Sequence, residues 1–151
     1  MINILKTFIF TVIIITFLII THTSITNIIW LYSIDMPVTF YLVISNIFYD
    51  LFGMNFNAAI PTGIIGLVAI GLALAFFITR TVLIWVNIDM KYAYAIAGGA
   101  AVAAIILLMP LAFYNLDLIA GARSLAGKSY LIASGILSGY FFGSNITIRE
   151  G

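Results

Sequence analysis

Near the C-terminal end of the chain, glycine recurs at every fourth position of an apolar stretch. The stretch reads Gly135-Ile136-Leu137-Ser138-Gly139-Tyr140-Phe141-Phe142-Gly143. Residues four apart lie on the same face of an α-helix, so the three glycines would form a flat strip. Helices in a lipid bilayer associate through such strips, because close packing replaces the hydrophobic effect that drives association in water. We therefore expect a second helix to lie against this face.

The sequence leaves the partner of this glycine row open. Residues 92–113 hold a dense run of small residues with Gly98 and Gly99 at its centre, and packing against them inside the same chain is one interpretation. A second interpretation is docking of another copy of the chain or of a foreign membrane subunit. A third is a row that lines the pore of a homo-oligomeric channel.

The composition predicts an integral membrane protein. Hydrophobic residues make up 64% of the 151 residues and charged residues only 7%, whereas about a quarter of the residues in soluble domains are charged. The mean hydropathy is +1.25. Long uncharged runs indicate helices, because membrane strands would show short segments of alternating polarity.

We expect one all-α domain over residues 1–151, a four-helix transmembrane bundle with an additional amphipathic helix in the first loop. The predicted spans are residues 5–20, 60–78, 92–113 and 129–144, and the second span could continue along the membrane surface to residue 88. The first segment also resembles a signal peptide. We expect it to be retained as a span.

Residues 37–52 form the predicted helix of the first loop. Pro37 is suited to a helix start and Gly53 to a helix end. Thr39, Asn46 and Asp50 fall on one polar stripe, so this helix is expected to lie in the membrane interface. The alternative makes residues 28–52 a fifth span or a re-entrant hairpin, which would bury two aspartates at roughly 2.5–3.5 kcal/mol each.

The basic residues near the predicted spans give the orientation. Cytoplasmic loops of membrane proteins carry an excess of Lys and Arg. One side of the predicted bundle would carry Lys6, Arg80, Lys91 and Arg149, and the other Arg123 and Lys128. The distribution predicts that both termini are cytoplasmic.

Several classes of chemistry are disfavoured by what the sequence lacks. The chain has no cysteine, which excludes disulfide exchange and thiolate ligation, and its single histidine provides no imidazole pair for haem or copper. It contains no phosphate-binding loop, zinc motif or nucleophile elbow. A formal charge of +1 does not favour nucleic acid. We predict no catalytic residue, no metal and no cofactor.

Ionisable residues near lipid are the candidate contact residues, because charge in a membrane is costly and therefore often functional. Asp35, Asp50, Arg80, Asp117 and Arg123 lie at predicted span ends or in loops. Headgroup anchoring or local ion pairing is the first interpretation for each. Contact with a ligand or an ion is the second.

Two groups of these residues could form a site. His22 with Asp35 and Asp50 could bind a divalent cation, although their spacing matches no known loop. Arg123 and Lys128, with Gly121 and Gly127 nearby, could clasp a phosphate headgroup or an anionic substrate.

The sequence thus favours a non-catalytic accessory or structural subunit that assembles, with itself or with other membrane subunits, through small-residue helix faces. A small oligomeric channel or transporter for an ion or an anionic solute is the alternative. A lipid-modifying enzyme is the third hypothesis.

Overall fold

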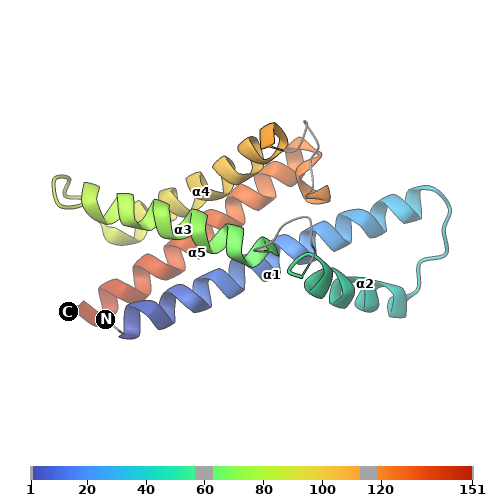
Figure 1. Cartoon of the computed structure of the whole chain (residues 1–151), viewed down its shortest axis with the longest axis horizontal. Coiled ribbons are helices and arrows are strands. Elements are labelled where there is room, and N and C mark those ends of the chain that lie inside the picture. The colour runs from blue at the N-terminus through green and yellow to red at the C-terminus, as the bar shows by residue number, and fades with distance from the viewer. Residues whose placement is uncertain (1, 57–62, 113–118, 151) are drawn as a thin grey trace.

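The computed structural model of the chain describes residues 2–56, 63–112 and 119–150. These residues form α1 (Ile2–Ser33), α2 (Phe40–Gly53), α3 (Gly63–Val82), α4 (Met90–Ala112), a short 3-10 helix η1 (Ala120–Ala122) and α5 (Leu125–Glu150) (Figure 1). The predicted all-α class is confirmed for this part of the chain.

Four of the helices make up the main body. In Figure 1, α3, α4 and α5 lie together with the first half of α1, and the second half of α1 continues away from them with α2 folded back beside it. We call this projecting pair, residues 21–53, the arm. Both ends of the described chain and the loop between α3 and α4 lie at one end of the body, called here the terminal end.

The α4–α5 contact is the most extensive between helices among the described residues, and it is made at glycines. A methyl group added at Gly139 would overlap the carbonyl oxygen of Tyr94, and one added at Gly135 would come within 2.6 Å of the carbonyl oxygen of Gly98. At Gly143 it would lie 2.8 Å from the Cα atom of Lys91. The glycine row therefore lies against α4, backbone to backbone. We call this contact the glycine seam.

Gly99 also lies at this contact, but differently. A methyl group there would meet the side chain of Ile136 at 2.6 Å instead of a backbone atom. The small-residue faces predicted from the sequence thus meet inside one chain, with Gly98 packed on the glycine row and Gly99 beside it.

Three helices within the described residues are long and apolar enough to cross a membrane: Asn3–Ser33, Gly63–Val82 and Met90–Leu111. α5 has 26 residues but is not among them. Within residues 125–146, Lys128 and repeated serines and glycines lower the hydropathy of α5. The predicted span at residues 129–144 lies within α5 and stays a prediction.

α1 is longer than the first span expected at residues 5–20. It runs to Ser33, so its 32 residues are about 48 Å long, whereas a hydrocarbon core is about 30 Å thick. The hydroxyls of Thr11, Thr23 and Thr26 donate to backbone carbonyls one turn earlier. A helix can therefore carry these polar residues without exposing unbonded hydroxyls.

The ends of the other helices also differ from the sequence expectation. α2 begins at Phe40 and not at Pro37, because Thr39 is its N-cap and accepts a hydrogen bond from the Leu42 amide at 3.3 Å. α3 ends at Val82 and is followed by turns, so the helix does not continue to residue 88. α4 includes Pro110 in its last turn.

α5 starts four residues before the predicted span. The hydroxyl of Ser124 accepts a hydrogen bond from the Gly127 amide at 3.0 Å, which satisfies an amide at the start of the helix. Asp89 plays the same role for α4, because its carboxylate accepts from the Lys91 amide at 3.1 Å.

One aromatic cluster joins four helices near the terminal end. Phe8 of α1, Phe76 of α3, Tyr94 of α4 and Phe142 of α5 pack together, with the rings of Phe76 and Phe142 stacked at 4.4 Å. The ring of Tyr94 meets both of them edge-on, at 5.2 and 5.1 Å. Such pairs stabilise beyond the area that they bury.

The glycine seam predicts a strong response to a single methyl group. Gly139→Ala should lower the free energy of unfolding by about 1–3 kcal/mol, the usual cost of overpacking. Alanine favours a helix over glycine by about 1 kcal/mol, so the clash must outweigh a gain. Thermal unfolding in mild detergent, followed by circular dichroism, measures this.

The matched control is Gly53→Ala at the end of α2, where an added methyl group has no atom within 4 Å. This variant should be as stable as the wild type or slightly more stable, because alanine favours the helix. Equal behaviour of the two variants would contradict the close packing at Gly139.

Candidate functional site

Asp50 holds α2 against α1. Its carboxylate accepts a hydrogen bond from the Ser24 hydroxyl at 2.6 Å and another from the Asn46 side-chain amide at 3.1 Å. Ser24 is fully buried and Asp50 is half-buried. The carboxylate thus has two partners where the arm leaves the main body, and bonding to charged groups makes such contacts stronger than neutral ones.

His22 lies on a different side of α1 and faces η1 and α5. Its ring stacks on that of Tyr130 with centroids 4.2 Å apart. A methyl group at Gly121 would come within 2.7 Å of the imidazole, and one at Gly127 would overlap the Gly121 carbonyl. These two glycines therefore let η1 pack tightly between α1 and α5.

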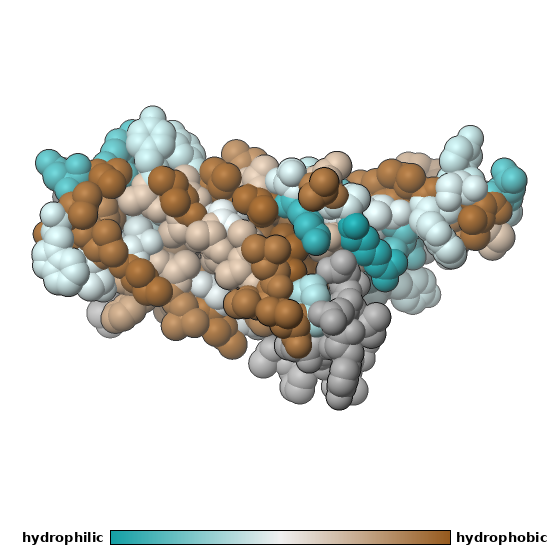
Figure 2. Space-filling model, turned by 90° about the horizontal axis from the view of Figure 1, so that it is seen from above, coloured by the Kyte–Doolittle hydropathy of each residue, from teal (hydrophilic) through white to brown (hydrophobic). Residues whose placement is uncertain are grey.

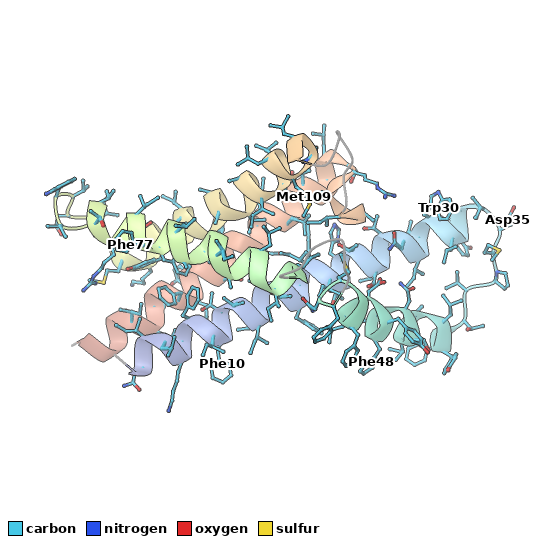
Figure 3. All side chains as sticks on the ribbon, viewed as in Figure 1. Phe10, Trp30, Asp35, Phe48, Phe77 and Met109 are labelled. Atoms are coloured by element: carbon cyan, nitrogen blue, oxygen red, sulfur yellow. The ribbon has the colours of Figure 1, made fainter. Side chains whose placement is uncertain are left out.

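Asp35 ends α1 in a left-handed conformation, with φ of 58°. The Asp35 amide donates to the Tyr32 carbonyl and the Met36 amide to the Leu31 carbonyl, both at 3.2 Å. This pattern is a Schellman motif, which normally places glycine at the position of Asp35. Figure 3 shows Asp35 at the far tip of the arm, beyond Trp30.

The structure does not bring together His22, Asp35 and Asp50, the three residues that could have formed a cation site. His22 packs on Tyr130, Asp50 bonds to Ser24, and Asp35 sits at the tip of the arm. Within the described ranges there is no group of three histidine, aspartate or glutamate side chains that could hold a metal ion.

The remaining candidate residues are spread over both ends of the body. Arg80 is exposed near the end of α3, with its Nη1 atom 4.0 Å from the sulfur of Met90. Arg123 follows η1 and is exposed, and Lys128 is half-buried in the first turn of α5. Asp117 lies outside the described residues.

An ion pair lies in the turn between α3 and α4 at the terminal end. The Lys91 amino group lies 3.4 Å from the Asp89 carboxylate, and both side chains are partly exposed. Exposed pairs of this kind contribute little to stability. Arg80, near the end of α3, and Lys91, near the start of α4, both lie at the terminal end.

The surface between the ends is largely apolar. Figure 2 shows hydrophobic side chains over most of one face, with hydrophilic residues near its two ends and in a patch near the middle. Large side chains such as Phe10, Phe77 and Leu107 are more than half exposed. A surface of this kind is expected to face lipid.

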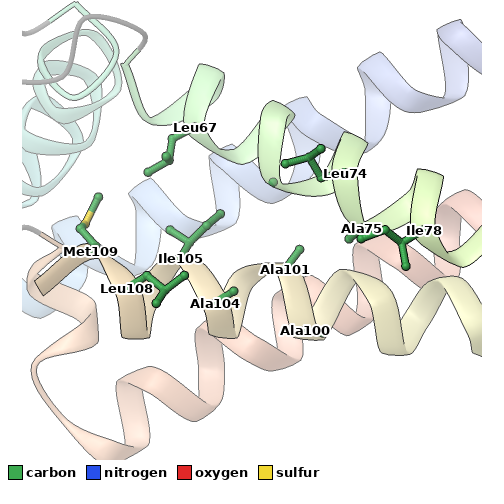
Figure 4. A pocket seen from close by; sticks show the side chains of 11 residues that line it. Leu67, Leu74, Ala75, Ile78, Ala100, Ala101, Ala104, Ile105, Leu108 and Met109 are labelled. Carbon is green, nitrogen blue, oxygen red and sulfur yellow. The ribbon is translucent and has the colours of Figure 1, made fainter. Parts of the chain in front are cut away.

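α3 and α4 leave a groove of about 490 Å³ between them (Figure 4). Its lining consists of Leu67, Gly71, Leu74, Ala75, Ile78, Ala100, Ala101, Ala104, Ile105, Leu108 and Met109. Five of these residues are glycine or alanine. We call this feature the α3–α4 groove.

Sequence reasoning missed several of these contacts. The sequence predicts a polar stripe that contains Asn46 and Asp50. It does not predict the hydrogen bond between Ser24 and Asp50. Nothing in the sequence marked Tyr130 as the partner of His22 or joined Phe8 to Phe142. A signal was available for the α3–α4 groove, because small residues recur at Gly71, Ala75 and along residues 100–104.

Known proteins offer no close comparison. No protein-family model, no curated protein and no solved structure matches this chain at a significant level.

The Schellman motif predicts that the backbone conformation of Asp35, and not its charge, determines the stability of the end of α1. Asp35→Gly should stabilise the end of α1 by about 0.5–1 kcal/mol, because glycine enters the left-handed region without a steric penalty. Asp35→Val should destabilise it by about 1–2 kcal/mol. Amide hydrogen exchange at residues 31–36 measures both effects.

Asp35→Asn removes the charge but tolerates the same backbone, so it serves as the control and should exchange as the wild type does. A large loss of protection in this variant would show that the charge itself stabilises the tip of the arm.

The bond between Ser24 and Asp50 predicts a cost for losing either partner. Ser24→Ala should lower the free energy of unfolding by about 0.5–1.5 kcal/mol, since interhelical hydrogen bonds in membranes contribute modestly. Once Asp50 is replaced by alanine, the same serine change should cost less. A double-mutant cycle measured by thermal unfolding gives the coupling.

Ser45→Ala on α2 is the matched control, because no hydrogen bond is assigned to its hydroxyl among the described residues. Additive effects of Ser24→Ala and Asp50→Ala would contradict a stabilising bond between them.

Proposed function

We propose that this protein is a non-catalytic accessory or structural subunit of a membrane complex. In this proposal α5 is the fourth span, both termini are cytoplasmic, and α2 lies in the interface. The α3–α4 groove would receive a helix of another membrane subunit, either a second copy of the chain or a different protein.

The groove is the observation that carries the proposal. The glycine seam is used inside the chain, so it is not free to receive a partner. The α3–α4 groove is another surface that contains small residues, five of the eleven that line it, and it is apolar along its lining. Small residues allow a neighbouring helix to approach closely, which is the usual basis of helix association in lipid.

The flanks of the groove favour a partner as well. Leu74 and Ile78 of α3 and Leu108 of α4 are each 60% exposed. Side chains that project beside a floor of small residues resemble the ridges and grooves through which helices pack. A partner helix would bury these side chains and fill the space that the alanines leave.

The test is the mass and composition of the particle extracted in mild detergent. We expect a particle heavier than the single 16.5 kDa chain. Ala104→Leu places a larger side chain in the groove and should weaken association about tenfold, corresponding to an overpacking cost of about 1–3 kcal/mol.

Ala73→Leu is the matched control, because Ala73 is also an exposed alanine but does not line the groove. It should leave the particle unchanged. A lone chain in the wild type, or equal behaviour of the two variants, would contradict the proposal.

A further inference from the structure

The arm, residues 21–53, has a polar contact between its two helices and large apolar side chains on its outside. Ser24 is fully buried and donates to the half-buried Asp50, which also accepts from the Asn46 side chain. α2 has no buried residue. The large apolar side chains exposed on the two helices are Ile25, Ile29, Trp30, Tyr32, Phe40, Tyr41, Ile44, Phe48, Tyr49 and Phe52. A hairpin in water would show the opposite distribution, so the surroundings of the arm are expected to be apolar.

These exposed side chains point in more than one direction. In Figure 3, Trp30 lies on the side of α1 that faces away from α2, and Phe48 on the side of α2 that faces away from α1. Both side chains are 62% exposed. A single partner surface would cover one of these two sides, whereas lipid can cover both.

The composition of the arm also favours lipid over another helix. Residues 21–53 contain no alanine and one glycine, Gly53, whereas helices in lipid associate through small residues. Tryptophan and tyrosine, which the arm exposes at Trp30, Tyr32 and Tyr41, are enriched at the boundary between hydrocarbon and headgroups. The arm thus differs from the α3–α4 groove, whose lining contains five glycine and alanine residues.

The arm has no lysine or arginine that could attract anionic headgroups. Residues 7–79 contain neither residue type, and the acidic residues of the arm are Asp35 and Asp50. Asp50 is bonded between the two helices, and Asp35 lies at the tip. Electrostatic recognition of anionic lipid relies on clusters of basic residues. Contact between the arm and lipid would therefore depend on apolar surface and not on charge.

The length of α1 places the arm at the far side of a bilayer. α1 contains no proline or glycine, the usual causes of a kink, and it continues without a break into the arm (Figure 1). From Lys6 to Trp30 the helix is about 36 Å long. A hydrocarbon core is about 30 Å thick, and a bilayer with its headgroups about 40–45 Å. With Lys6 at the boundary of one leaflet, Trp30 reaches the headgroup layer of the other.

We propose that the arm is a lipid anchor, held in the leaflet opposite the terminal end by the outward aromatic side chains of both helices. Its partner is the boundary between acyl chains and headgroups, recognised through apolar burial and not through headgroup charge. The anchor rests on the proposed function, in which α2 lies in the interface, and adds the second half of α1 to the lipid contact. The bond between Ser24 and Asp50 keeps the carboxylate partnered while lipid surrounds the outside of the arm.

The native tryptophan of the arm can report its surroundings. Trp85→Phe leaves Trp30 as the single tryptophan of the chain. The full chain with this change is reconstituted in phosphatidylcholine vesicles, with or without bromine on the acyl chains close to the headgroup. We expect the brominated lipid to quench the fluorescence of Trp30 strongly and aqueous acrylamide to quench it weakly. Exchange of part of the phosphatidylcholine for phosphatidylglycerol should leave both results unchanged.

Three outcomes of this experiment would overturn the anchor. Quenching of Trp30 by acrylamide and not by brominated lipid would place the arm in water. Protection from both quenchers would mean that protein covers the arm, either a second copy of the chain or a different subunit. Quenching by brominated lipid only when phosphatidylglycerol is present would show that headgroup charge is required.

Phe48→Ser, made in the Trp85→Phe chain, removes one outward ring from α2. It should shift the equilibrium of the arm between lipid and water about tenfold toward water, the usual effect of exposing one phenylalanine. Phe10→Ser is the matched control, because Phe10 is 61% exposed on the first half of α1, outside the arm. Circular dichroism checks that both variants remain folded. Equal changes in the quenching of Trp30 would overturn the role of the arm.

The anchor and the subunit proposal can fail separately. Ala104→Leu, in the α3–α4 groove, should change the mass of the particle and leave the quenching of Trp30 unchanged. Phe48→Ser should do the reverse. A heavy particle with Trp30 in water would overturn the anchor alone, and a lone chain with Trp30 in lipid would overturn the subunit proposal alone.

Discussion

The direct backbone contact between α4 and α5 is the constraint on which the rest of the structure depends. At the glycine seam the two helices approach so closely that no side chain fits between Gly139 and Tyr94. This contact fixes the position of α5, and α5 in turn carries Phe142 to the aromatic cluster and Tyr130 to His22. The placement of α1 against the body therefore depends on a contact in which α1 takes no part.

Two surfaces of the chain contain several small residues, the glycine seam and the α3–α4 groove. One is satisfied internally and acts as a structural joint. The other lines the groove between α3 and α4. Both surfaces use small residues of α4, Gly98 at the seam and Ala100, Ala101 and Ala104 in the groove, but larger apolar side chains also line the groove.

The sequence was sufficient for the class of fold and for much of its order. Hydropathy predicted long apolar helices, and the spacing of Gly135, Gly139 and Gly143 predicted a close helix contact. It was less informative where the outcome depends on contacts between distant residues. The length of α1 could not be read from hydropathy, because His22, Thr23 and Ser24 look like a loop until their packing against η1, α5 and α2 is known. The charge of Asp35 suggests a possible ligand. In the structure Asp35 has a left-handed backbone and terminates α1, which composition alone does not predict.

The meeting of α1 with α5 has a consequence for how the protein folds during synthesis. α3 and α4 are adjacent in sequence and can pair early. The aromatic cluster is complete only when Phe142 of α5 contacts Phe8 of α1. Until then Gly98 and its neighbours on α4 lack their partner on α5. Contacts between segments far apart in sequence form slowly, because the intervening chain must be ordered first. The first helix would therefore lack its contacts with α5 until the last part of the chain has been made.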